Sequence, residues 1–231
     1  VRLQIPMQVY SADGELMAQY GEKRRIPLTL NQIPPVMVKA FIATEDSRFY
    51  HNPGVDVRGI VRAIVINLQG GEVIAGGSTI TQQLAKNALL TQEQTLKRKI
   101  QEAVLALQIE RKYTKAEILE LYLNQIYFGQ GAYGVQAAAQ TYFGKNVEDL
   151  DLAECAAIAG ITNLPTYYDP FYSVKNNKQR QETILYQMYD QGYISKDEYE
   201  SAKAEELHFV RSESENYEQT IYSYYTETVI S

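Results

Sequence analysis

The sequence has one cysteine and two histidines, and no apolar stretch is long enough to cross a bilayer. A single cysteine excludes an internal disulfide, and ligands this few and this scattered give no support to a metal cluster. Cys155 lies among small apolar residues, where a buried hydrophobic role is the better interpretation. Because no run of about 18 apolar residues exists, nothing here is expected to span a membrane. One domain of an anchored protein would show the same composition.

Positive charge is also scarce, because 28 acidic residues face 22 lysines and arginines, for a net charge of −6. This balance predicts no basic surface for nucleic acid. The acidity is uneven: residues 192–231 hold 9 acidic and 3 basic side chains, whereas residues 1–191 hold 19 of each. A hydrophobic fraction of 45% is sufficient for a core. The sequence therefore predicts one main domain followed by an acidic segment.

Residues suited to catalysis concentrate between positions 45 and 102. The motifs are Glu45–Phe49 (EDSRF), Gly76–Gln83 (GGSTITQQ) and Arg98–Glu102 (RKIQE). Two carboxylates thus bracket a polar segment and several cations. This arrangement suits a general base at one end and an anionic leaving group held in the middle.

A helix is predicted from Pro35, which can occupy a first helical turn because its missing N–H costs nothing there. The helix delivers Glu45 and Asp46 at its C-terminus, where acidic side chains oppose the helix dipole. This locally unfavourable placement indicates a functional role. The alternative is that the pair caps the following helix.

A second helix is predicted over residues 55–68, with an apolar side edged by Arg58 and Arg62. Such a helix can pack into a core or lie in a membrane interface. The residues alone favour the core. The apolar side consists of Ile60, Val61, Ile64, Val65 and Leu68. The glycine-rich stretch that follows, 69–77, predicts a mobile flap over the site.

Ser78 or Thr79 can cap a third helix over 78–87, whose N-terminal N–H groups would favour a nearby anion. Gln82 and Lys86 share one face of this helix through their i,i+4 spacing. A solvated surface is the alternative interpretation for Gln82 and Gln83.

A long helix is predicted from a capping box at Thr91 to about Tyr113. Arg98 and Glu102 lie opposite its main apolar face, so Glu102 is expected where the polar side turns apolar, in a cleft. An ordinary surface pair of Arg98 and Glu102, worth a few tenths of a kcal/mol, is the alternative. The expected core face consists of Leu96, Ile100, Ala103, Val104 and Leu107.

The remainder predicts an all-α domain with a short N-terminal β-hairpin. The hairpin is expected over residues 7–20 around the turn Asp13-Gly14. Further helices are expected over 115–124, 135–142, 152–161, 174–191 and 195–206, several with Ser, Thr or Asp at the N-cap. After Phe209 the composition becomes that of a linker.

The motifs EDxxF, GGSTITQQ and RKxxE resemble those of the family 51 glycosyltransferases. These are the peptidoglycan polymerase domains of class A penicillin-binding proteins and of monofunctional transglycosylases. The match extends over roughly residues 7–209. Lys115–Asn124 fits the fourth family motif, and the fifth, RRxxVL, is partly present at Arg180, Gln181, Ile184 and Leu185. Asn52 stands where the family usually has His, and Gln94 near a common Arg.

The resemblance implies a lysozyme-like fold and the polymerisation of lipid II into β-1,4 glycan strands, with release of lipid pyrophosphate. Glu45 corresponds to the general base, and Glu102 would orient cations or hold Mg²⁺ or Mn²⁺ against the pyrophosphate. No organic cofactor is implied. The implied substrate-binding residues are Asp46, Asn52, Ser78, Thr79, Gln82, Gln83, Lys86, Arg98 and Lys99.

The implied partners are lipid II, the lipid-linked glycan strand, the membrane surface and other cell-wall synthesis proteins. The resemblance also favours a membrane-interface position for the apolar helix in 55–75, rather than the core. The implied location is the outer face of the bacterial cytoplasmic membrane, with the anchor outside this chain. On this interpretation residues 1–209 form the glycosyltransferase domain and residues 210–231 lead towards an absent transpeptidase domain. Two rival functions remain: a lysozyme-like glycan hydrolase, and a non-catalytic scaffold that binds lipid II.

Overall fold

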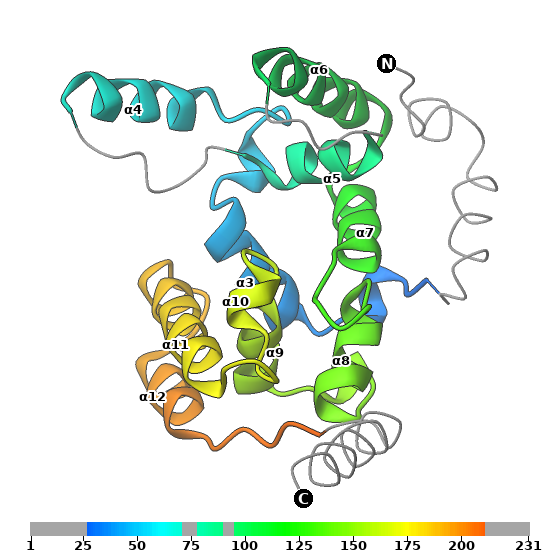
Figure 1. Cartoon of the computed structure of the whole chain (residues 1–231), viewed down its shortest axis with the longest axis vertical. Helices are drawn as coiled ribbons and strands as arrows, with labels where there is room; N and C mark the ends of the chain where they lie inside the picture. The colour runs from blue at the N-terminus through cyan, green and yellow to red at the C-terminus, as the bar shows by residue number, and fades with distance from the viewer. Residues whose placement is uncertain (1–26, 71–77, 90–94, 211–231) are drawn as a thin grey trace, which may run out of the picture.

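Helices form nearly all the regular structure in this computed structural model, which describes residues 27–70, 78–89 and 95–210 (Figure 1). Within these ranges the β contact is the isolated bridge between Tyr127 and Tyr133. The mostly helical fold expected from the sequence is therefore confirmed. The predicted hairpin at 7–20, the glycine-rich stretch 71–77 and the acidic segment beyond residue 210 lie outside the described residues.

The chain order of the elements is as follows, with 3₁₀ helices marked η: η1 (Leu30–Gln32), α3 (Pro35–Glu45), η2 (Phe49–His51), α4 (Val57–Leu68), α5 (Ile80–Ala88), α6 (Leu96–Lys112), α7 (Lys115–Gln125), α8 (Val135–Phe143), η3 (Val147–Asp149), α9 (Leu152–Ala159), α10 (Pro165–Tyr168), α11 (Val174–Asp190) and α12 (Lys196–Ala204). In Figure 1, α4, α5 and α6 lie at one end of the molecule, α9 to α12 lie towards the other, and α7 lies between them.

Local capping sets most of the helix starts. Thr79, Thr114 and Asp151 each close a capping box with the residue three positions later. The sequence predicts the box at Thr114, a cap at Asp151, and a cap at either Ser78 or Thr79. The start of α6 differs from the prediction, because Thr95 caps it by accepting a hydrogen bond from the Arg98 N–H at 3.2 Å. The predicted capping box at Thr91 lies outside the described residues, and α6 begins at Leu96.

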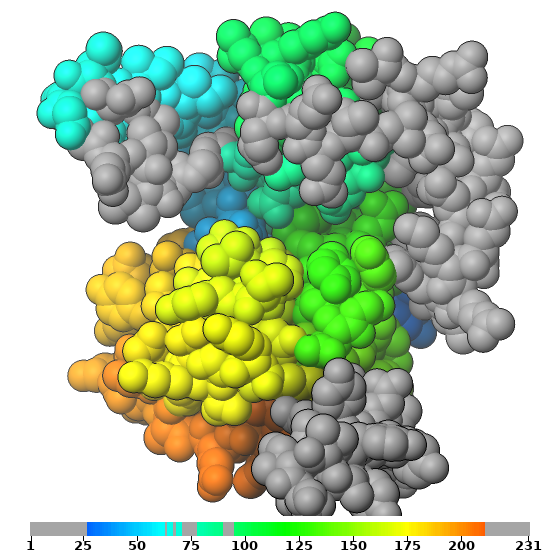
Figure 2. Space-filling model, viewed as in Figure 1, coloured from blue at the N-terminus to red at the C-terminus, as the bar shows by residue number. Residues whose placement is uncertain are grey.

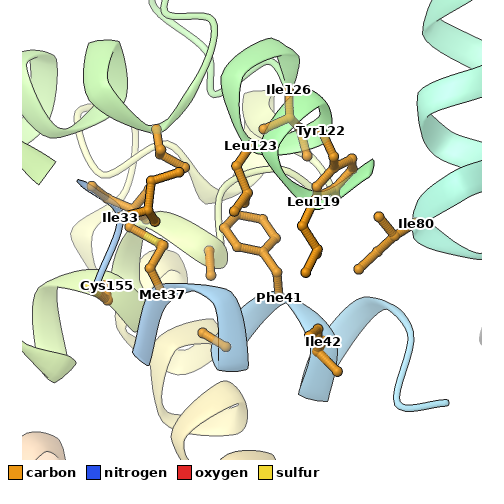
Figure 3. Packing of buried hydrophobic residues seen from close by; sticks show 14 of the residues in the cluster. Ile33, Met37, Phe41, Ile42, Ile80, Leu119, Tyr122, Leu123, Ile126 and Cys155 are labelled. Atoms are coloured by element: carbon orange, nitrogen blue, oxygen red, sulfur yellow. The ribbon is translucent and has the colours of Figure 1, made fainter. Parts of the chain in front are cut away.

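The core is built around α3, whose buried residues contact α9 and α11 and, through Phe41, Tyr122 of α7. Phe41 packs edge-on against Tyr122 and Phe128, with ring centroids 5.8 and 6.1 Å apart. Figure 3 shows Phe41 directed towards α7, with Met37 and Cys155 in the same cluster. Cys155 is fully buried, as expected from its neighbours. This packing holds the C-terminus of α3, and thus Glu45, in place.

The orientation of α6 is the main departure from the sequence-based expectation. Leu96 and Ile100, assigned to the core by periodicity, are 79% and 57% exposed. The opposite side, which carries Arg98, Glu102 and Leu105, is buried. Helix α6 packs against α5 through this mixed side, so the purely apolar stripe is left on the surface.

Helix α4 also exposes its apolar residues, which makes the core interpretation of 55–68 wrong. Leu68 is 83% exposed, and six further apolar side chains are exposed with it: Val57, Ile60, Val61, Ile64, Val65 and Ile66. Figures 1 and 2 show α4 projecting at the same end of the molecule as α6. The two exposed apolar stripes therefore belong to one end of the protein.

Candidate active site

Glu45 is the last residue of α3, and its side chain meets the first turns of α5. The Gln83 side-chain amide donates a hydrogen bond to Glu45 Oε2 at 3.3 Å. The Tyr122 hydroxyl donates in turn to Gln83 Oε1 at 3.0 Å, so α7 orients the amide. The second oxygen, Glu45 Oε1, is buried and has no hydrogen-bond partner among the described residues. One oxygen of the carboxylate is thus anchored, and the other remains available to accept a proton.

The surroundings of Glu45 disfavour its charged form. Burial raises the pKa of the Glu45 carboxyl above its ordinary value, and neighbouring Asp46 adds to the rise. The Arg180 guanidinium and the Gln83 hydrogen bond act in the opposite direction and lower this pKa. The net shift brings the pKa of the Glu45 carboxyl closer to neutral pH, which suits a general base.

Asp46 serves the protein's own structure. Its carboxylate accepts a hydrogen bond from the Ile80 N–H at the start of α5 (3.1 Å) and one from the Asn52 side chain (2.9 Å). Burial raises the pKa of the Asp46 carboxyl, although these two hydrogen bonds and the Lys115 charge lower it. The anion that the N-terminus of α5 attracts is therefore Asp46, and it connects the end of α3 to that helix.

Asn52 completes the same connection. Its side-chain amide also donates to the Arg48 carbonyl at 3.2 Å, and its Oδ1 accepts from the Gly54 N–H at 3.0 Å. Gly54 has φ +101°, and a Cβ there would lie 2.7 Å from the Glu110 side chain, so the turn requires glycine. The predicted substrate ligand Asn52 is thus fully engaged in holding the 46–54 segment.

Thr79 and Gln82 form the capping box of α5. The Thr79 N–H donates to Gln82 Oε1 at 2.9 Å, and the Gln82 N–H donates to Thr79 Oγ1 at 3.0 Å. The Thr79 hydroxyl donates further to the Gly54 carbonyl at 2.6 Å. Both residues are buried, so the solvated-surface alternative is wrong for Gln82.

Glu102 lies on the buried side of α6, 2% exposed. The Lys99 ammonium is 3.5 Å from Glu102 Oε1 and 3.4 Å from the Ser78 hydroxyl. Three predicted site residues therefore lie together at the start of α5. Gln83, one turn further along α5, contacts Glu45, so the first turns of α5 connect the surroundings of the two carboxylates.

Arg98 and Lys86 differ in their surroundings. Arg98 is buried on the same side of α6 as Glu102, so the alternative of an exposed Arg98–Glu102 surface pair is wrong. Lys86 is exposed near the end of α5. Its role towards a substrate stays a prediction.

Among the described residues, three groups near Glu45 or Asp46 were not predicted as site residues. Lys115, on α7, donates to the Asn52 carbonyl at 2.7 Å and pairs with Glu110 at 2.6 Å. Tyr122 orients Gln83, and Arg180 acts on Glu45 from α11. Their motif positions were visible in the sequence, but only the packing of α7 and α11 against α3 shows what they contact.

The comparisons with known proteins identify relatives over most of the chain. A family model described as Transglycosylase matches residues 13–189. Penicillin-binding protein 1A of Escherichia coli (strain K12) is 58% identical over 207 residues, which are 90% of this chain and 24% of that protein. Penicillin-binding protein 1A of Aquifex aeolicus is 50% identical over 195 residues, 84% of this chain and 27% of that protein.

A solved structure shows the same likeness. The crystal structure of penicillin-binding protein 1A from Haemophilus influenzae aligns with a TM-score of 0.51 and 32% sequence identity. The alignment covers 82% of this chain and 19% of that chain. The chain thus spans about a quarter of the length of the curated relatives it matches.

Proposed function

This chain belongs to the transglycosylase family and is a peptidoglycan glycosyltransferase domain of the class A penicillin-binding protein type, and from that premise we propose that it polymerises lipid II into β-1,4 glycan strands with Glu45 as the general base. The observation that carries the proposal is the state of the Glu45 carboxylate. One oxygen is anchored by Gln83, and the other is buried without a hydrogen-bond partner in the described residues.

The proposed step is a single displacement. Glu45 Oε1 takes the proton of the acceptor sugar's 4-hydroxyl while that oxygen bonds to the anomeric carbon of the lipid-linked donor. The bond from the anomeric carbon to the lipid pyrophosphate breaks, and the leaving group carries away the electron pair. A carboxylate whose pKa is raised by burial is a stronger base than an exposed one, which favours this proton transfer.

The leaving group needs positive charge more than a proton, because a pyrophosphate is already anionic. Lys99, next to Ser78 and Glu102, is the cation that the geometry supports best. We assign Arg98 and Lys86 to the same task on the basis of the family motifs. Glu102 holds the Lys99 ammonium and thus acts as a positioning residue for it.

A divalent ion fits this site only in a limited way. Within the described residues no group of three His, Cys, Asp or Glu side chains could hold a metal. Glu102 would be the single protein ligand of Mg²⁺ or Mn²⁺, with the pyrophosphate supplying further oxygens. Such an ion would neutralise charge on the leaving group, as the lysine also does.

The exposed apolar stripes of α4 and α6 fit a membrane surface. In the described ranges no helix has the length and apolar character to cross a bilayer. Both stripes are edged by cations, Arg58 and Arg62 on α4 and Lys97 and Arg111 on α6, which suits anionic lipid headgroups. A lipid-linked substrate has to be met at that surface, on the outer face of the cytoplasmic membrane. We propose likewise that the fold is lysozyme-like and that a linker begins after residue 209.

The test is polymerisation of labelled lipid II by this fragment, followed by glycan sizing. Glu45→Gln should abolish polymer formation, and Glu148→Gln, at an exposed site on η3, should leave it unchanged. Fragments released from preformed glycan would support the hydrolase instead. Binding of lipid II without any turnover would support the scaffold and refute the proposal.

A further inference from the structure

Helix α11 contributes polar side chains to the end of α3 that the mechanism above leaves unused. The Gln191 side chain, just beyond α11, donates to the Ala43 carbonyl at 2.8 Å, two residues before Glu45. Arg180, in the middle of α11, is close enough to Glu45 to lower the pKa of its carboxyl. Glu45 therefore has polar neighbours on the α11 side as well as on the α5 side.

Glu45 Oε1 and Arg180 Nε are two of five buried polar atoms on α3 and α11 that have no hydrogen-bond partner among the described residues; the others are Thr44 Oγ1, Asn177 Oδ1 and Gln187 Oε1. Glu45 Oε1 accepts hydrogen bonds and Arg180 Nε donates one. Buried polar groups are nearly always paired, so an unpaired donor and an unpaired acceptor on facing helices indicate a missing ligand. A hydroxyl group fits both, because its hydrogen can go to the carboxylate while its oxygen accepts from the guanidinium.

The path of the Arg180 side chain is defined by the neighbouring helices. Gly160, which ends α9, lies beneath it, and a Cβ at Gly160 would be 2.9 Å from Arg180 Cγ. The guanidinium carbon lies 5.8 Å from the centroid of the Tyr168 ring on α10. Arg180 is thus held between the end of α9 and α10, with Tyr168 against its guanidinium. Cation–π packing alone would explain the Tyr168 contact but leaves Nε unpaired.

The adjacent residue, Gln181, has a different role. It is fully buried, and its amide donates to the Ala153 carbonyl at 3.0 Å, while its Oε1 accepts from Lys178. Gln181 therefore joins α11 to α9, and Arg180 is the member of this pair that faces the site.

We propose that Arg180 is a substrate-contacting residue whose Nε–H donates to the oxygen of the same acceptor hydroxyl that gives its proton to Glu45. The inference rests on the proposed function. As the proton moves to Glu45 and the oxygen bonds to the anomeric carbon, charge that remains on the oxygen is stabilised by the guanidinium. The bond that breaks is still the one to the lipid pyrophosphate, so Arg180 adds no proton and no electron to the balance.

The experiment compares Arg180→Lys, Arg180→Ala and the control Lys175→Gln on the polymerisation of labelled lipid II. Lys175 is an exposed cation on the same helix, so its loss tests the effect of charge alone. Loss of one preorganised donor should lower kcat roughly 10²-fold in both Arg180 variants, with the control near the parent. Lysine keeps the charge and most of the packing but lacks Nε. If Arg180→Ala fails to fold, Arg180→Lys decides the question.

A second readout tests whether the Arg180 charge acts on Glu45. Arg180 lowers the pKa of Glu45, and Asp46 raises it. The charge of Glu45 in turn raises the pKa of Tyr122. The acidic limb of the kcat/KM profile should therefore move to higher pH in Arg180→Ala. Gly160→Ala, which displaces the arginine without removing it, should lower kcat about tenfold.

Two outcomes would overturn the inference. One is an Arg180→Lys rate within about threefold of the parent, and the other is an unshifted acidic limb in a folded Arg180→Ala variant. An inactive parent fragment would instead refute the proposed function, so the two failures are distinguishable.

Discussion

Gln83 holds Glu45 by one carboxylate oxygen, through a hydrogen bond of 3.3 Å, and leaves the other oxygen buried without a partner in the described residues. Because Gln83 belongs to α5 and Glu45 to α3, this contact depends on how the two helices meet. Asp46 supplies that connection through the Ile80 N–H. The orientation of the Glu45 carboxylate thus depends on how α3 and α5 meet.

The first prediction concerns Gln83 itself. Gln83→Leu removes a hydrogen bond that lowers the pKa of Glu45, so the acidic limb of the pH–rate profile should move to higher pH. Loss of orientation should also lower kcat about tenfold. Tyr122→Phe, which removes the hydroxyl that positions Gln83, should shift the profile in the same direction by less. An unchanged profile in Gln83→Leu would contradict the orientation of Glu45 described above.

Glu45→Gln should stabilise the fold while it abolishes activity. Burial raises the folded-state pKa of Glu45 above the ordinary 4.5, so its contribution to stability is complete below pH 4.5 and is lost as the pH rises through the folded value. Near neutral pH the ionised carboxylate therefore destabilises the fold, whereas glutamine cannot ionise.

Thermal unfolding across a pH series measures this difference. The Tm of Glu45→Gln should exceed that of the parent near neutral pH, and the gap should shrink as the pH falls. A variant less stable than the parent at neutral pH would argue against a raised pKa at Glu45.

The two carboxylates should respond differently to metal. Glu45→Gln should lower turnover roughly 10²–10⁴-fold at any concentration of Mg²⁺ or Mn²⁺, the usual range for a general base. Glu102→Gln should also impair turnover, but with an altered dependence on the divalent ion, because Glu102 is its only proposed protein ligand. Titration of each variant with metal in the lipid II assay measures this. If turnover depends on metal concentration identically in Glu102→Gln and in the parent, Glu102 is excluded as a metal ligand.

The exposed apolar stripes should mediate binding to lipid. Ile60→Ser/Ile64→Ser on α4 and Ile100→Ser/Val104→Ser on α6 should each weaken co-sedimentation with vesicles containing anionic lipid. These four side chains are exposed, so little stability should be lost. Val174→Ser, an exposed apolar position on α11, serves as the control. Vesicle binding that survives both double variants would exclude the two helices as the membrane contact.

Lys86 tests how far the family motifs predict function where the described residues show no partner for the side chain. If its ammonium contacts the pyrophosphate, Lys86→Ala should fold normally and lose roughly 10²–10³ in rate. Exposure of this side chain makes a folding defect unexpected. Lys39→Ala on α3 is a matched loss of one lysine. A rate within about threefold of the parent would remove Lys86 from the site.

The sequence by itself determined the features that depend on near neighbours in the chain. The capping boxes at Thr79, Thr114 and Asp151 form because the bonded groups are three residues apart. The placement of Glu45 and Asp46 at the end of a helix also follows from the sequence, because Pro35 can begin the helix and an apolar run follows it. The family motifs then identified these residues as belonging to a glycosyltransferase.

Only the tertiary structure decided which faces are buried and which distant residues meet. Periodicity assigned Leu96 and Ile100 to the core, yet α6 buries the side with Arg98 and Glu102. An apolar stripe shows that a helix face avoids water, but protein core and lipid satisfy it equally, so the pattern cannot distinguish them. The approach of Arg180 to Glu45 is likewise invisible in sequence, because it arises from the packing of α11 against α3.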